Sequence, residues 1–384
     1  MKKERIEELD VLRGLAFLAV VYQHVIGAFI NKPAINYQEA IMLGMAFNLS
    51  KFAVPAFVMI TGITLYYNYS EKIQYVSFIK KRATEIFIPF VIWTIIYYLY
   101  AHRNGPIQFD FLLLKELGSE LIIPKIGYHL WFVVMIFQFY LFYPFILSFV
   151  TWCRAKVSLR MALLSLTVIY LFFMWLSSDY LLSVGSNLPW VIQKLIDTRT
   201  MNAFFYFMYF AIGALIALRL KEWRNFINRS FEWNIFLFVA LFILVGYELI
   251  SGNPSKVMIG YSTSLKISMF FFTVSSLMMI YDLCLRMTTS DSIVYRFFRF
   301  VGKYSFGAYL SHALVISLLS QTATAIGIPI TGKNSLTGSL ALLIPSSLLS
   351  VLLTVLISRL PLGMLLIGSV PKLKKKEGKE RAAA

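Results

Sequence analysis

The stretch LDVLRGLAFLAVVYQHV, residues 9–25, decides the class of fold because it is an apolar run that nevertheless carries Arg13 and His24. These two residues are eleven positions apart, so at about 100° per residue both project from nearly the same helix face, about 16 Å from one another along the axis. Asp10 lies three residues before Arg13 and shares that face. Because an ionisable group in hydrocarbon costs several kcal/mol, the polar stripe must face a bundle interior or a water-filled cavity.

The rest of the chain has the composition of an integral membrane protein. Its 384 residues are 59 % hydrophobic and 16 % aromatic, with a mean hydropathy of +0.71, far from a soluble globular domain. We predict an all-α polytopic membrane protein, with one transmembrane domain over 1–365 and a basic cytoplasmic tail over 366–384. About ten stretches are long enough to cross a bilayer core of about 30 Å, near 11–30, 40–68, 84–101, 128–150, 159–177, 201–218, 233–250, 264–285, 303–325 and 338–360.

The basic residues predict the orientation of these spans. Of the 36 lysine and arginine residues, 24 fall in the termini and in alternate loops, which by the positive-inside rule places both termini in the cytoplasm. The net charge of +17 then follows from topology and from contact of the tail with anionic membrane lipid, and no nucleic-acid partner is needed. The two cysteines, Cys153 and Cys284, support neither a disulfide framework nor a metal site. We expect a multi-pass protein of a bacterial cytoplasmic membrane.

Five segments resemble the membrane acyltransferase-3 family, in which an arginine and a histidine separated by ten residues in the first helix are the defining pair. The resemblance runs from about residue 5 to 360, and its first and fourth segments are the specific ones. The segments are ELDVLRGLAFLAVVYQH (8–24), FAVPAFVMITG (52–62), KRATEIFIPFVIW (81–93), HLWFVVMIFQFYLFYP (129–144) and VGKYSFGAYLSHALV (301–315).

This resemblance implies O-acylation of an extracytoplasmic glycan from a cytoplasmic acyl-CoA co-substrate, with acetyl-CoA the expected donor and no bound cofactor. Arg13 and His24 match the family's essential pair. The chain departs from the family at Thr84 and Glu85, where relatives often carry a second basic residue. The enzyme would act alone or with partner proteins of a polysaccharide biosynthesis system.

The chemistry can also be argued from the residues. Transfer of an acyl group from a thioester to a hydroxyl needs a base for the hydroxyl proton and a group that stabilises the oxyanion. His24 suits the base because the pKa of free imidazole is about 6.5, and Arg13 suits the donor phosphates, which guanidinium binds in bidentate fashion. Direct transfer and an acyl-histidine intermediate both remain open. The structural alternatives are a snorkelling anchor for Arg13 and an interhelical hydrogen bond for His24.

Further polar side chains are weaker candidates for substrate binding. His129 could line an acceptor entrance, although with Trp131 it also fits an interfacial aromatic belt. His312 has a depth comparable to His24 and could face it, or it could make a structural hydrogen bond. Lys51 must pair or reach water, and could bind an anion or snorkel outward.

Two more residues complete the candidate site. Asp10 could bind substrate or simply pair with Arg13 as an ion pair at the helix end. Arg82 is a candidate for binding the donor, because the basic loops contain no glycine-rich phosphate loop.

A polysaccharide exporter or secondary transporter is the alternative function. Such a protein is expected to carry inverted repeats with paired broken helices in its two halves. Pro55 and Pro89 both fall in the first half of the chain, without evident counterparts in the predicted spans six to eight. This distribution favours the enzyme.

Overall fold

The predicted all-helical architecture is confirmed for the part of the chain that the structure describes. The computed structural model describes residues 4–30, 35–70, 73–106, 110–156, 159–176, 189–251, 256–257, 259–327 and 335–370, which contain helices and turns but no strand. The predicted basic tail lies outside the described residues from 371 onward. The longer helices are α1 (Glu8–Ile30), α2 (Tyr37–Ser50), α3 (Ala53–Tyr69), α4 (Tyr75–Arg82), α5 (Ile88–Ala101), α6 (Phe111–Ile122), α7 (Trp131–Lys156), α8 (Leu159–Trp175), α10 (Trp190–Asp197), α11 (Phe207–Leu218), α12 (Leu220–Arg229), α13 (Phe231–Ser251), α14 (Ile267–Thr288), α15 (Ile293–Ala325) and α16 (Ser335–Ile357).

Short helical turns connect or extend these helices. They are the π-helical η1 (Ala83–Phe87), the 3₁₀ turns η2 (Tyr128–Leu130), η5 (Arg199–Met201), η6 (Ala203–Tyr206) and η7 (Ile259–Ser262), and α17 (Gly363–Ile367). The π turn η1 lies between α4 and α5 and joins them into one span.

The count of about ten spans is not confirmed, although each predicted span coincides with a helix. Seven described helices or joined helices are long and apolar enough to cross a membrane, or eight if the bent pair α11 and α12 forms one span. The predicted spans near 159–177, 201–218 and 303–325 correspond to α8, α11 and α15, which are not among the seven. The positions of Pro55 and Pro89 suggested that interrupted helices are confined to the first half of the chain. The angle of 106° between α11 and α12 shows an interrupted helix in the second half as well.

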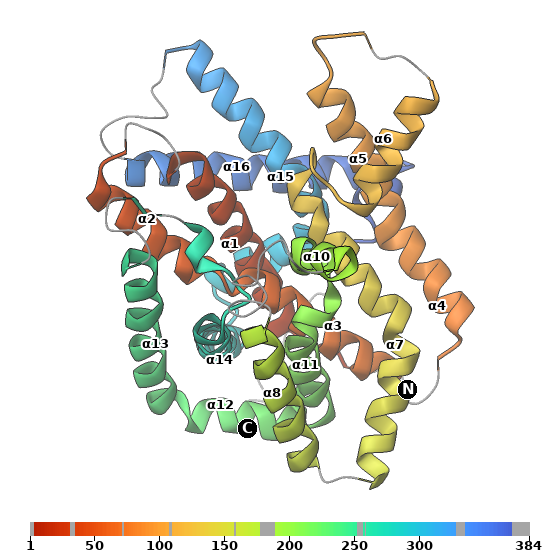
Figure 1. Ribbon diagram of the computed structural model, residues 1–384, viewed down its shortest axis with the longest axis vertical. Helices are drawn as coiled ribbons and strands as arrows, with labels where there is room; N and C mark the ends of the chain where they lie inside the picture. Colours follow the sequence, from red (N-terminus) through yellow and green to blue (C-terminus); the bar gives the residue numbers. More distant parts are fainter. Residues whose placement is uncertain are drawn as a thin grey trace, which may run out of the picture.

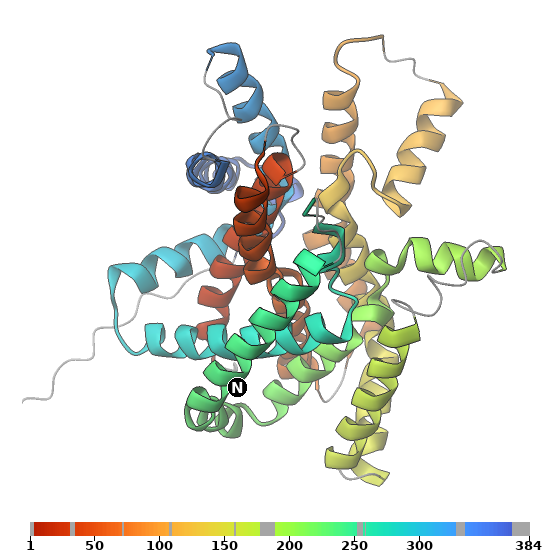
Figure 2. The ribbon, with the colours of Figure 1, turned by 60° about the vertical axis from the view of Figure 1, so that its left-hand side comes forward.

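Helix α1 is the central element of the bundle. It packs most extensively on α15 and also contacts α2, α3, α14 and α16. Figure 1 shows α1 in the middle of the molecule with α15 beside it, and Figure 2 shows α7 and α8 side by side at the lower right. The polar stripe on α1 is therefore surrounded by other helices, as its composition requires.

Pairs of glycines allow the two closest helix crossings. A Cβ on Gly14 would collide with the Phe298 carbonyl of α15, and a Cβ on Gly302 would collide with the Asp10 carbonyl of α1. A second pair, Gly62 and Gly213, does the same where α3 crosses α11. Small residues let helix backbones approach within a membrane, so the first crossing fixes α1 beside Arg13.

The first turn of α1 is also held by an ion pair whose carboxylate is buried. Glu8 accepts hydrogen bonds from the Arg224 guanidinium of α12 at 2.9 and 3.0 Å, and from the Tyr281 hydroxyl of α14 at 3.0 Å. Its carboxylate is nearly fully buried, so these partners offset the cost of its desolvation.

Candidate functional site

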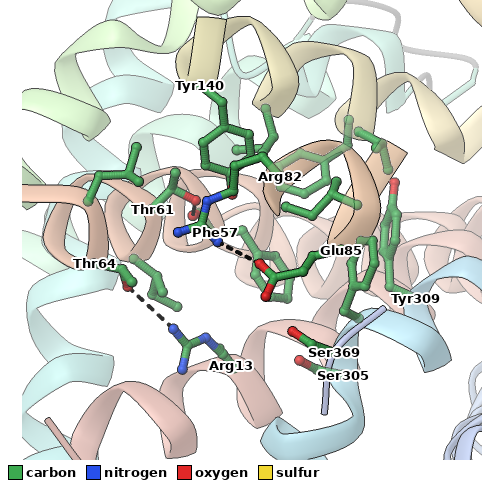
Figure 3. A pocket seen from close by; sticks show the side chains of 17 residues that line it. Arg13, Phe57, Thr61, Thr64, Arg82, Glu85, Tyr140, Ser305, Tyr309 and Ser369 are labelled. Atoms are coloured by element: carbon green, nitrogen blue, oxygen red, sulfur yellow. Dashed lines mark hydrogen bonds and ion pairs between the residues drawn. The ribbon is translucent and has the colours of Figure 1, made fainter. Parts of the chain in front are cut away.

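A cavity of about 230 Å³ lies beside the first half of α1. Its lining comes from α1, α3, α4, η1, α7, α15 and the segment after α17, and Figure 3 shows its polar side chains pointing inward. Apolar side chains such as Phe57 and Ile136 form much of the remaining surface. The polar lining residues are Arg13, Thr61, Thr64, Arg82, Glu85, Tyr140, Ser305, Tyr309 and Ser369.

Arg13 faces this cavity and is fixed by two neighbours. Its guanidinium donates to the Asp10 carboxylate at 3.0 Å and to the Thr64 hydroxyl at 3.4 Å. Asp10 is buried and also accepts a hydrogen bond from Arg5 at 2.7 Å. Asp10 thus positions Arg13 rather than lining this cavity, although Asp10, Arg13 and Thr64 line a second, adjoining pocket of about 300 Å³.

Arg82 lines the same cavity, so the structure brings together both predicted donor-binding arginines. Its guanidinium pairs with the Glu85 carboxylate at 3.1 Å. The two arginines come from α1 and α4, and Figure 3 shows the Glu85 carboxylate beside Arg82, with Arg13 apart from it and next to Thr64.

Three histidines form a cluster further along α1. The ring centroids of His24 and His312 are 5.1 Å apart, those of His129 and His312 are 4.7 Å apart, and those of His24 and His129 are 6.2 Å apart. They come from α1, η2 and α15. The predicted facing of His24 and His312 is thus present, and His129 joins them. In the described part of the chain, no group of histidine, cysteine or acidic side chains has the geometry of a metal site.

The hydrogen bonds of two of these histidines assign their tautomers. His312 Nδ1 lies 2.5 Å from the Tyr309 carbonyl, and His129 Nε2 lies 3.4 Å from the Leu310 carbonyl. Because a carbonyl only accepts, each of these nitrogens carries the hydrogen, which in a neutral ring leaves a lone pair on the other nitrogen. Those other nitrogens, His312 Nε2 and His129 Nδ1, are buried and have no partner among the described residues.

The cluster approaches the surface beside Tyr128. The Tyr128 ring contacts the His24 ring at 5.1 Å between centroids and is 49 % exposed. His24 itself is partly exposed, whereas His129 and His312 are buried. A hydroxyl compound that approaches from this side would therefore reach His24 before the other two histidines.

One aromatic side chain lies between the cavity and the cluster. The Tyr309 ring lines the cavity, and its centroid is 5.5 Å from those of both His129 and His312. Its hydroxyl donates a hydrogen bond to the His129 carbonyl, and Phe132 packs edge-on against it. The cavity and the histidine cluster are thus adjacent to one another along α1.

The two remaining predicted residues have different surroundings. Lys51 lies in the turn between α2 and α3, with its ammonium 4.3 Å from the centre of the Phe47 ring. The carbonyl of the preceding Ser50 accepts a hydrogen bond from the side chain of Gln23, the residue before His24. Trp131 makes its described ring contacts with Phe132 and Tyr206, and is not among the residues lining the cavity. Lys51 therefore belongs to the surroundings of the cluster, whereas Trp131 belongs to the neighbouring aromatic packing.

Several cavity residues were not among the sequence candidates. Thr61 and Thr64 sit three residues apart in an apolar span, and this spacing was a usable signal for one polar helix face. Ser305 and Tyr309 are four apart on α15 and carry the same signal. Ser369 follows α17, and no pattern in the sequence connects it to the others.

Comparison with known proteins gives one match. The acyltransferase-3 family model, described as an acyltransferase domain, matches residues 6–359. No curated protein and no solved structure matches the chain.

Proposed function

Because the chain belongs to the acyltransferase-3 family, and so is a membrane acyltransferase, we propose that it transfers an acyl group from acyl-CoA to a hydroxyl of an extracytoplasmic glycan. The observation that carries the proposal is the arrangement along α1, in which a cavity with two guanidiniums adjoins a cluster of three histidines. The cavity suits an anionic donor and the cluster suits proton transfer. The positive-inside rule places the Arg13 end of α1 toward cytoplasmic CoA.

In the proposed reaction, one ester bond forms and one thioester bond breaks. His24 accepts the proton of the acceptor hydroxyl as its oxygen attacks the thioester carbonyl, and the protonated imidazole returns that proton to the departing CoA thiolate. Arg13 and Arg82 bind the donor phosphates. The turn that carries Lys51 is hydrogen-bonded to Gln23, next to His24, and the charge of Lys51 would help to stabilise the oxyanion. Attack by His24 itself, giving an acyl-histidine, uses the same residues.

The remaining assignments follow from position. His129, His312 and Tyr128 adjoin His24 on the side where the glycan would enter. Acetyl-CoA is the proposed donor, in a bacterial cytoplasmic membrane with both termini inside. Partner proteins of a polysaccharide biosynthesis system would supply the acceptor.

The test is release of the CoA thiol by the purified protein in liposomes, with acetyl-CoA or succinyl-CoA and candidate glycans. We expect acceptor-dependent release that falls by about 100-fold or more in His24→Ala, the range of a lost general base. His102→Ala is the matched control, because His102 stacks on Tyr98 at 4.2 Å and lies outside the cluster. No release with any donor, together with surface polymer that is lost on deletion and restored by His24→Ala, would instead support an exporter.

A further inference from the structure

The cavity beside the first half of α1 contains a carboxylate where an anionic donor would bind. Glu85 lines the cavity with Arg13 and Arg82, and its side chain is 19 % exposed. Figure 3 shows its carboxylate lying between Arg82 and the hydroxyls of Ser305 and Ser369. A negative charge in a site that binds phosphate opposes its ligand, so Glu85 needs an explanation.

The backbone around Glu85 presents this side chain to the cavity. Glu85 lies in the π-helical turn η1, and π turns are rare features that often occur at functional sites. The peptide at Gly368, which has a φ of 69°, passes so close to the Glu85 carbonyl that any Cβ there would collide with it. This approach brings Ser369 into the cavity opposite Glu85.

Arg82 is held rigidly against aromatic rings. Its guanidinium carbon lies 5.3 Å from the ring centres of both Phe78 and Tyr140 and 6.0 Å from that of Tyr69. Its side chain is 15 % exposed, and its Nη1 atom donates to Glu85. The Arg82 Nε atom is buried without a hydrogen-bond partner among the described residues. With its guanidinium packed among these rings, Arg82 is the less exposed partner of the pair, and we expect the carboxylate of Glu85 to move when the pair opens.

Each arginine of the cavity is therefore already paired. Arg13 pairs with Asp10, which is buried and also held by Arg5, whereas Arg82 pairs with Glu85, which lines the open space. Displacing Asp10 would leave a buried charge, which is costly. Displacing Glu85 requires only rotation within the cavity, so its pair is the one that an incoming anion can open.

We propose that Glu85 occupies the anion-binding position of Arg82 in the empty cavity and competes there with the phosphate groups of the acyl donor. The inference rests on the proposed function in one respect, namely that the donor binds in this cavity. Glu85 is thus a specificity-determining residue that weakens binding of highly charged phosphates, so that the CoA product is not retained.

The experiment measures dissociation constants for CoA and for inorganic pyrophosphate by calorimetry on the detergent-solubilised full chain. Glu85→Gln keeps the size of the side chain and removes its charge. We expect it to tighten binding of both ligands by up to about fivefold, the size expected when a partly exposed ion pair no longer has to be broken. Arg82→Gln should weaken both, and Glu85→Gln should have little further effect in the Arg82→Gln background.

The matched control is Glu248→Gln, which removes a carboxylate from the Glu248–Lys266 pair outside the cavity and should change neither constant. Unchanged or weaker binding in Glu85→Gln, or a gain that persists without Arg82, overturns the inference. If CoA binds and is used normally while that gain is absent, the proposed function stands and the role of Glu85 fails. If pyrophosphate binding tightens but no variant binds CoA, the anion site stands and the assigned donor is wrong.

Discussion

At the scale of single residues, the histidine cluster separates two roles that one ring can play. His312 uses Nδ1 for the hydrogen bond to the Tyr309 carbonyl, while its Nε2 atom has no partner among the described residues. The first nitrogen fixes the ring on α15, and the second is available as a proton acceptor beside His24. The structural and the chemical interpretations of His312 therefore refer to different atoms.

These interpretations can be tested with His312→Asn and His312→Gln. The asparagine amide can keep a donor near the position of Nδ1, so we expect stability within about 1 kcal/mol of wild type. Because the lone-pair nitrogen is lost, acyl transfer should fall by about 100-fold. The longer glutamine side chain in His312→Gln should instead lose the hydrogen bond to the Tyr309 carbonyl, so this variant should be less stable than His312→Asn. The measurements are thermal unfolding in detergent and CoA release, and a fully active His312→Asn variant would leave only the structural role.

At the scale of elements, the crossing of α1 and α15 determines where Arg13 points. Gly302 approaches the backbone of Asp10, the residue whose carboxylate binds Arg13. The same crossing brings Gly14 against Phe298. A shift of α15 along this contact would move both the guanidinium in the cavity and the ring of His312.

Gly302→Ala should therefore damage both the fold and the site. A Cβ there would collide with the Asp10 carbonyl, and overpacking of this kind costs about 1–3 kcal/mol. Gly118→Ala on α6 is the matched control, because a Cβ at Gly118 would meet no atom of the described residues within 4 Å and alanine favours helix by about 1 kcal/mol. We expect Gly302→Ala to have a lower unfolding temperature and weaker CoA binding than wild type, and the control variant to show neither change. Equal stability of the two variants would show that the helices are not closely packed in the membrane.

At the scale of the whole molecule, the sequence predicted the features that follow from the cost of polar groups in the membrane. It did not predict the features that depend on contacts between distant segments. The cost of charge in hydrocarbon was enough to place Arg13 and His24 on an internal face of α1. Each span predicted from hydropathy coincides with a helix, but hydropathy did not reveal the short helices α6, α10 and α12, and the count of about ten spans stays a prediction. Ser369 reaches the cavity only because a glycine passes beside η1, a contact that no periodicity encodes.

A passage between the cavity and the histidine cluster is needed if a donor in the cavity is to supply an acyl group to an acceptor at the histidines. Tyr309 lies at their boundary, with its ring on the cavity and its hydroxyl bound to the His129 carbonyl. Phe132 lines the cavity next to it. If the donor binds in the cavity as proposed, this aromatic pair would separate its thioester from water that enters beside Tyr128, and exclusion of water would prevent loss of the acyl group by hydrolysis.

Tyr309→Ala should open this boundary. We expect release of CoA without acceptor to rise by about tenfold over wild type, because water then reaches the thioester before the glycan does. Tyr309→Phe keeps the ring and loses only the hydrogen bond to His129, so its release should remain dependent on acceptor. The measurement is CoA thiol release in liposomes with and without glycan, after size-exclusion chromatography has confirmed that both variants are folded. If CoA release by Tyr309→Ala depends on the acceptor as strongly as release by wild type, the ring does not separate the cavity from the histidine cluster. The barrier to water must then lie elsewhere along α1.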